Sequence, residues 1–147
     1  MLMNNYFIDT SALFKRYIPE AGTDILDDIF KNSGSFYISD VTIIEVISNL
    51  KRKNEITKEL SNSIYKKIKS EFFNDIASGN LKTTGILSET IIEAINLIDT
   101  KYLTPLDSIQ LAAALRLNAK NGNTVFVCSD KKLCTLAEKC GLESLLI

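Results

Sequence analysis

The chain has 147 residues, a net charge of −1 and 46% hydrophobic residues, so we expect residues 1–147 to form a single folded domain. No apolar run approaches the roughly 18 residues of a membrane helix, and the amino terminus lacks the basic start of a secretory signal; we therefore expect a cytoplasmic protein that does not contact membranes. The near-neutral charge excludes a strongly basic nucleic-acid coat, so any such binding would use local patches.

Two features of the composition narrow the chemistry. The chain contains no histidine, which excludes Ser-His-Asp and Cys-His catalysis and removes the commonest general base near neutral pH. Any hydrolysis would need another means of activating water, and a metal ion does so by lowering the pKa of bound water. Cys128, Cys134 and Cys140 form no Cys-x-x-Cys pair, so we expect small buried thiols in a reducing cytoplasm and no zinc site.

The first half of the chain alternates short apolar segments with helical patterns. Ser39 or Asp40 can cap the helix that follows the second apolar segment. The stripe of apolar residues at four-residue spacing in the fourth helix drifts around its axis, which implies a bend or a second partner surface. We expect strands over residues 6–8 and 36–38, and helices over residues 11–17, 23–31, from the cap to about 53, and 57–77.

The second half continues the alternation. Thr104-Pro105-Leu106-Asp107 predicts a helix start, with Thr at the cap, Pro at the first position and Asp at the third. Short strands that alternate with helices predict an α/β fold with a largely parallel, helix-covered sheet. We expect strands over residues 81–86, 124–127 and 144–147, and helices whose caps are Ser88, Thr104 and Ser129.

Three acidic residues stand where an apolar segment gives way to a helix start: Asp9, Asp107 and Asp130. In open α/β sheets, ligands gather just beyond the carboxyl ends of the strands. Taken singly, each acid is explained more simply as a helix-start residue, because a carboxylate is favourable at the positive end of the helix dipole.

Glu45 is harder to explain in this way, because it lies in the middle of an apolar helix. The position four residues later holds Asn49, so no i+4 lysine compensates its charge. A solvated, mixed helix face remains the alternative.

The combination of these acids favours a functional site. Parallel topology would bring the segments after the first and fourth strands to one edge of the sheet. Carboxylates that meet there repel one another unless a cation or shared protons join them, and hard divalent cations prefer oxygen ligands. We therefore expect Asp9, Glu45, Asp107 and Asp130 to be catalytic residues that hold Mg²⁺ or Mn²⁺.

Neighbouring polar residues are candidates for supporting roles. Ser11 and Ser129 flank two of the acids and can orient them or bind a metal-held water, although helix capping explains both serines as well. Arg16, Lys131 and Lys132 lie near the acids in the sequence, where they are candidate contacts for phosphate groups.

The ordered set of motifs resembles the PIN-domain family, and VapC-type toxins in particular. Phe7-Ile8-Asp9-Thr10-Ser11 is similar to the opening motif of the family, and Ser39-Asp40 with Glu45 is similar to its second acidic segment. The run Asp107-Ser-Ile-Gln-Leu-Ala-Ala-Ala-Leu resembles the third, and Val127-Cys-Ser129-Asp130 resembles the fourth. Ser129 departs from the Thr of many members but keeps the hydroxyl group.

This resemblance implies a three-layer α/β/α fold with a short, mainly parallel central sheet. It also implies a Mg²⁺- or Mn²⁺-dependent ribonuclease, a homodimer, and inhibition by a small cognate antitoxin. Asp9, Glu45, Asp107 and Asp130 would form the acidic site, with Ser11 in support. Many relatives place Arg or Lys closer to the third acid than Lys101, so the set of RNA-contacting residues stays open.

Other functions fit the sequence less well. A phosphoryl-aspartate hydrolase would usually have a second acid two residues after Asp9, where Ser11 stands. A receiver domain would have adjacent acids near the first strand, which are also missing. A PIN-like module that binds RNA or a protein without cleaving RNA remains the non-enzymatic alternative.

Overall fold

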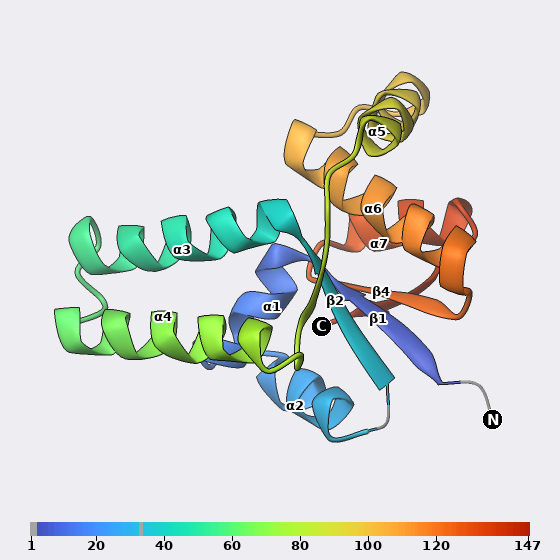
Figure 1. Ribbon diagram of the computed structural model, residues 1–147. Coiled ribbons are helices and arrows are strands. Elements are labelled where there is room, and N and C mark those ends of the chain that lie inside the picture. The colour runs from blue at the N-terminus through green and yellow to red at the C-terminus, as the bar shows by residue number, and fades with distance from the viewer. Residues whose placement is uncertain (1–2, 33) are drawn as a thin grey trace.

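The computed structural model describes residues 3–32 and 34–147, and five parallel strands form its centre (Figure 1). Their order in the sheet is β3-β2-β1-β4-β5. Strands β2 and β3 are added on one side of β1, and β4 and β5 are added on its other side, so the topological switch point lies between β1 and β4. Such a switch point opens a crevice beyond the carboxyl ends of the two strands. The strands are β1 (Asn4–Ile8), β2 (Gly34–Ser39), β3 (Lys82–Thr84), β4 (Thr124–Cys128) and β5 (Glu143–Leu146).

Alternating side chains of the strands build one hydrophobic core on each face of the sheet. Phe7 and Phe126 point to one face, where their rings stack with centroids 6.1 Å apart. Ile8 and Val127 point to the other face. Because both faces are covered, the strands are apolar on both sides, as parallel sheets require.

Seven helices among the described residues cover the two faces and give the expected α/β/α layering. Figure 1 shows α3 and α4 as an antiparallel hairpin that extends away from the sheet, with α5 and α6 on the opposite side. One core includes residues of α1 (Thr10–Tyr17), α2 (Thr23–Lys31), α3 (Asp40–Glu55) and α4 (Asn62–Ala77). The other includes residues of α5 (Ser88–Thr100), α6 (Pro105–Asn121) and α7 (Lys131–Lys139).

Most of the predicted elements are confirmed, and the helix starts need three corrections. The helix expected from residue 57 begins at Asn62, because Lys58 adopts a left-handed φ of 56° and Ser61 provides the cap. Ser88 is the first residue of α5 and not its cap, which is Leu87. The last helix is capped by Asp130 and not by Ser129.

The helices in residues 3–32 and 34–147 do not have the length and apolar character that crossing a membrane requires.

Candidate metal centre

Asp9 lies at the junction of β1 and α1, next to the switch point of the sheet. Its backbone N–H donates to the carbonyl of Val127 on β4 at 2.9 Å, which continues the pairing of the two central strands. The residue is 6% exposed, and it occupies the N-cap position of α1 without a side-chain capping hydrogen bond. Helix capping therefore does not account for this buried carboxylate.

The pKa values of Asp9 and Asp107 are raised partly by the negative charges of other acids of the site. Burial, together with the negative charges of Asp107 and Glu45, raises the pKa of Asp9 from 3.8 to about 6, although the amides of Ser11 and Thr10 act in the opposite direction. Burial also raises the pKa of Asp107, where a hydrogen bond with Thr104 opposes the shift and the charge of Asp130 adds to it. Asp9 is therefore affected by the charges of Asp107 and Glu45, and Asp107 by that of Asp130, so the four acids are linked electrostatically.

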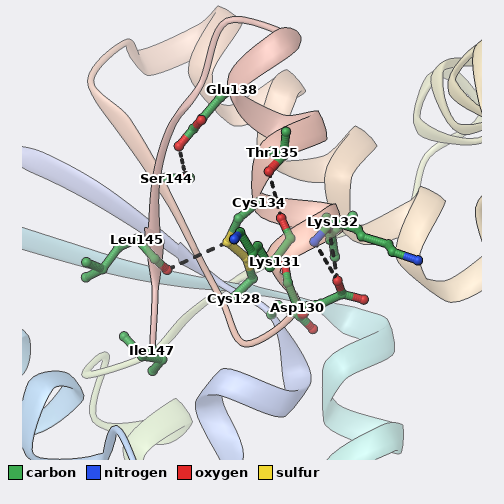
Figure 2. Close-up of a disulfide and its surroundings, with 12 residues drawn as sticks. Cys128, Asp130, Lys131, Lys132, Cys134, Thr135, Glu138, Ser144, Leu145 and Ile147 are labelled. Carbon is green, nitrogen blue, oxygen red and sulfur yellow. Dashed lines mark hydrogen bonds between the residues drawn. A yellow bond between two sulfur atoms is a disulfide. The ribbon is translucent and has the colours of Figure 1, made fainter.

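Asp107 and Asp130 both lie at helix starts, and their local roles differ. Thr104 caps α6 by accepting the N–H of Asp107 at 3.3 Å, as predicted. Asp130 caps α7 with its own carboxylate, since Oδ1 accepts the N–H groups of Lys132 at 2.8 Å and Leu133 at 3.3 Å (Figure 2). One oxygen of Asp130 therefore has a structural role, whereas Oδ2 is not engaged by this cap.

Glu45 is held by side chains that the sequence analysis did not single out. Its Oε1 accepts the hydroxyl of Thr10 at 3.0 Å and the side-chain amide of Gln110 at 3.3 Å. Gln110 lies one helical turn after Asp107 on α6. Its position as a polar residue inside a run rich in alanine and leucine is the sequence feature that could have identified it as part of the site. Glu45 is half-buried, and the alternative of a solvated helix face does not describe it.

The two candidate supporting serines differ in their contacts. Ser11 Oγ donates to Asp9 Oδ2 at a long 3.4 Å. Ser129 Oγ is buried and has no hydrogen-bond partner among residues 3–32 and 34–147. A buried hydroxyl without a partner is costly, and its position next to Asp130 suits a ligand or a bound water at the site.

Arg16 has internal partners, unlike the other candidate phosphate contacts. Its guanidinium donates from Nε to Asp75 Oδ2 at 3.1 Å and from Nη2 to Asp75 Oδ1 at 3.4 Å, and it lies over the ring of Phe30 at 4.0 Å. Lys131 and Lys132 are exposed at the start of α7. The two lysines directly follow Asp130 in the chain, whereas the charge of Arg16 is engaged by Asp75.

The cysteine prediction was partly wrong. Cys128 and Cys134 are buried as expected, yet the structure joins them as a disulfide between the end of β4 and α7 (Figure 2), whereas Cys140 is a free thiol. The turn from β4 into α7 brings their Cα atoms to 6.3 Å, a separation within the range of disulfides. The sequence separation alone did not reveal this approach.

The donor set fits a hard divalent ion. Carboxylate and hydroxyl oxygens are the ligands that Mg²⁺ and Mn²⁺ prefer, and a cation beside Asp9 would offset the burial and the neighbouring negative charges that raise the pKa of this carboxyl. In the described part of the chain, no three acidic or cysteine side chains already stand in coordinating contact. The acids therefore share a field without forming a closed cage.

A cavity of 660 Å³ elsewhere in the molecule does not involve these acids. Ser35 at the start of β2 and Lys82 at the start of β3 line it, which places it at the amino ends of the strands, opposite the carboxylates. The chemistry of the acids lies at the other edge.

Comparisons with known proteins agree with this architecture. The family model described as the PIN domain matches residues 6–139. No curated protein matches the sequence significantly.

Solved structures share the fold at low sequence identity. VapBC2 from Rickettsia felis bound to a DNA fragment from their promoter matches with a TM-score of 0.66, 14% identity, and coverage of 97% of this chain and 98% of that chain. FitAcB from Neisseria gonorrhoeae matches with a TM-score of 0.68, 12% identity, and coverage of 95% and 96%. DNA-bound VapBC from Salmonella typhimurium matches with a TM-score of 0.62, 13% identity, and coverage of 97% and 98%. At these identities the likeness establishes the fold alone.

Proposed function

Because the chain belongs to the PIN domain family, we propose that it is an endoribonuclease that uses Mg²⁺ or Mn²⁺ to hydrolyse phosphodiester bonds in RNA. The observation that carries this proposal is the coupling of the acids: burial raises the pKa of Asp9 and of Asp107, and the charges of Asp107 and Glu45 add to the first shift while that of Asp130 adds to the second. Carboxylates that disfavour one another's charge favour a cation among them.

The side chains would divide the work as follows. Asp9, Asp107 and Asp130 would hold the ion directly or through water, and Glu45 would be a further ligand or would position the attacking water. A bound divalent ion supplies a water of lowered pKa and positive charge opposite the phosphate. Ser11 would orient Asp9, Ser129 would bind a metal-held water, and Lys131 and Lys132 would attract phosphates of the RNA.

The test is cleavage of labelled RNA by the purified protein. We expect cleavage with Mg²⁺ or Mn²⁺ that is lost with EDTA and in Asp9→Asn. Asp28→Asn is the matched control, because Asp28 is an exposed acid on α2 that pairs with Lys31 on the same helix. RNA binding without cleavage in any metal would instead support a non-catalytic PIN-like module.

We further propose that the protein is the toxin of a type II toxin–antitoxin pair and acts in the cytoplasm as a single domain. The motif resemblance to VapC-type toxins supports this, as does the fold shared with VapBC and FitAcB. Expression of the chain should arrest growth, and co-expression of the product of a small adjacent gene should relieve the arrest. Normal growth with an active wild-type protein would argue for a housekeeping nuclease.

The expected homodimer is also part of this proposal. Helix α5 buries Thr90, Ala94 and Leu97 against the core, while a second apolar row on the same helix stays exposed. Such contiguous apolar surface commonly marks an interface. The exposed residues are Leu87, Ile91, Ile92 and Ile95. Analytical ultracentrifugation should detect a dimer that Ile92→Glu converts to a monomer.

A further inference from the structure

A chain of buried polar side chains lies directly behind Glu45. Gln110 is 1% exposed, and its Nε2 contacts Thr42 Oγ1 at 2.6 Å, Thr10 Oγ1 at 3.0 Å and Glu45 Oε1 at 3.3 Å. Its Oε1 accepts the hydroxyl of Ser39 at 3.1 Å. Side chains of α1, β2, α3 and α6 therefore meet in one network.

The donors of this network are directed toward Glu45. The hydroxyl of Thr10 donates to Glu45 Oε1 at 3.0 Å. Thr10 Oγ1 is then free to accept, and both Gln110 Nε2 and the hydroxyl of Thr42, 3.1 Å away, can supply a proton. The hydroxyl of Thr10 thus donates to Glu45 and accepts from a neighbouring donor at the same time.

The orientation of the Gln110 amide follows from the same argument. If its oxygen and nitrogen were exchanged, Gln110 Oε1 would face the carboxylate of Glu45, and two acceptors would repel each other. The observed orientation places the amide nitrogen toward Glu45 and the oxygen toward Ser39. Glu45 and Gln110 thus fix each other's rotamers.

The network engages one oxygen of Glu45 and leaves the other. Within residues 3–32 and 34–147, the hydrogen bonds to this carboxylate reach Oε1 only. We infer that Gln110 and Thr10 are positioning residues, which hold Oε1 of Glu45 and present its Oε2 to the divalent cation; this rests on the proposed metal-dependent function.

The place of the two residues in the chain supports a positioning role over simple core filling. Thr10 directly follows Asp9, and Gln110 lies three residues after Asp107 on the same helical face. The network therefore couples the position of Glu45 to two other carboxylates of the site. Apolar residues of similar volume would fill the core without the cost of burying several polar groups.

The test compares two variants of similar side-chain volume with a variant that keeps the hydroxyl. Thr10→Val removes the hydroxyl that donates to Glu45, and Thr10→Ser retains it. Gln110→Met removes the whole set of amide hydrogen bonds. Thr90→Val is the control, because Thr90 is equally buried and its hydroxyl accepts a backbone N–H, that of Leu87, away from the site. Thermal unfolding establishes that each variant folds, and Thr10→Val alone decides the question if Gln110→Met does not fold.

The primary measurement is Mn²⁺ affinity, followed by electron paramagnetic resonance without RNA. We expect Thr10→Val and Gln110→Met to weaken Mn²⁺ binding by about 10–100-fold, the effect typical of residues that orient metal ligands. Thr10→Ser and Thr90→Val should bind Mn²⁺ as the wild type does. At saturating Mn²⁺, kcat should fall in the two weakened variants while KM for RNA stays within about threefold, since the phosphate contacts are unchanged.

The outcomes separate this inference from the proposed function. A wild-type protein that binds Mn²⁺ and cleaves RNA, together with folded Thr10→Val and Gln110→Met variants of unchanged Mn²⁺ affinity, would overturn the positioning role alone. A wild-type protein that neither binds Mn²⁺ nor cleaves RNA would overturn both. Equal loss of Mn²⁺ affinity in Thr10→Val and Thr10→Ser would also contradict the inference, because Thr10→Ser keeps the hydroxyl that donates to Glu45 and Thr10→Val does not.

Discussion

The negative charge of Asp107 raises the pKa of Asp9, although the two residues begin helices on opposite faces of the sheet. They come together because β1 is the central strand and both α1 and α6 start at its carboxyl edge, where Gln110 of α6 contacts Thr10 of α1 at 3.0 Å. Burial is the larger cause of the shift. In the absence of a ligand, the surroundings of Asp9 therefore disfavour its negatively charged form.

Asp9→Asn should stabilise the metal-free protein. A shift of the pKa from 3.8 to about 6 corresponds to about 3 kcal/mol of unfavourable interaction with the charged form, and the amide removes that charge. We expect urea unfolding in EDTA at pH 7.5 to give a larger free energy of unfolding for the variant, by up to this amount. A variant that is less stable than the wild type would show that the carboxylate is stabilised by its surroundings.

The same group makes stability depend on pH. The folded-state pKa of Asp9 lies above its unfolded value, so the folded state binds more protons between about pH 4 and 6. Stability from this group is therefore present below pH 4 and is lost as the pH rises through 6. The difference between Asp9→Asn and the wild type in EDTA should be largest at pH 7.5 and should vanish near pH 4. A constant difference across this range would refute the assignment to Asp9.

Two substitutions at Asp130 should separate its cap from its charge. Asparagine caps helices about as well as aspartate, whereas alanine loses about 1 kcal/mol. Asp130→Ala should therefore unfold more easily than Asp130→Asn, since Oδ1 accepts two N–H groups at the start of α7. Under the proposed function, both variants should lose at least about tenfold in RNA cleavage, because each removes a carboxylate proposed to hold the metal ion. Full activity in Asp130→Asn would show that Asp130 caps α7 and does not hold the metal ion.

Arg16→Met should reduce stability and not RNA binding. Burial acts to raise the pKa of Asp75, but hydrogen bonds from Arg16, Tyr17 and Asn80 outweigh it and hold the pKa below its usual value. Loss of Arg16 leaves a largely buried acceptor with fewer partners, at a cost of about 1–3 kcal/mol. Lys31→Met, which breaks an exposed pair with Asp28, is the control and should change stability by less than about 1 kcal/mol. Weaker RNA binding by Arg16→Met at full stability would restore its role as a phosphate contact.

Lys131→Met with Lys132→Met should have the opposite profile. Both side chains are exposed, so stability should change little, while RNA binding to the Asp9→Asn protein should weaken. The slope of log K against log salt should become shallower by about 0.7 for each lost phosphate contact to a single strand. An unchanged slope would place the RNA elsewhere.

Local chemistry explains which parts of the fold and site were predictable from the sequence. Thr104, Pro105 and Asp107 interact within one helical turn, so their pattern predicted the start of α6 correctly. Asp9 was found because it follows an apolar strand directly. In contrast, the start of α4 depends on the left-handed backbone of Lys58, which an apolar stripe running through the same residues does not reveal.

The features that sequence analysis missed depend on contacts across the chain. Gln110 looks like an ordinary polar residue in a helix, and only its packing against Thr10 and Thr42 buries it. The pairing of Cys128 with Cys134 depends on the turn between β4 and α7. Whether Asp130 or Ser129 caps α7 is decided by a single residue of register, which lies within the usual uncertainty of helix boundaries.

The central place of β1 has a consequence for the timing of folding during synthesis. One of its two neighbours, β2, emerges from the ribosome soon afterwards, but the other, β4, begins only at Thr124. Parallel pairings over such sequence distances form late, and the N–H of Asp9 has its partner only when Val127 has been made. A nascent chain thus carries Asp9 and Glu45 long before it carries the complete set of acids, so under the proposed function any cleavage of RNA is delayed until translation has passed β4.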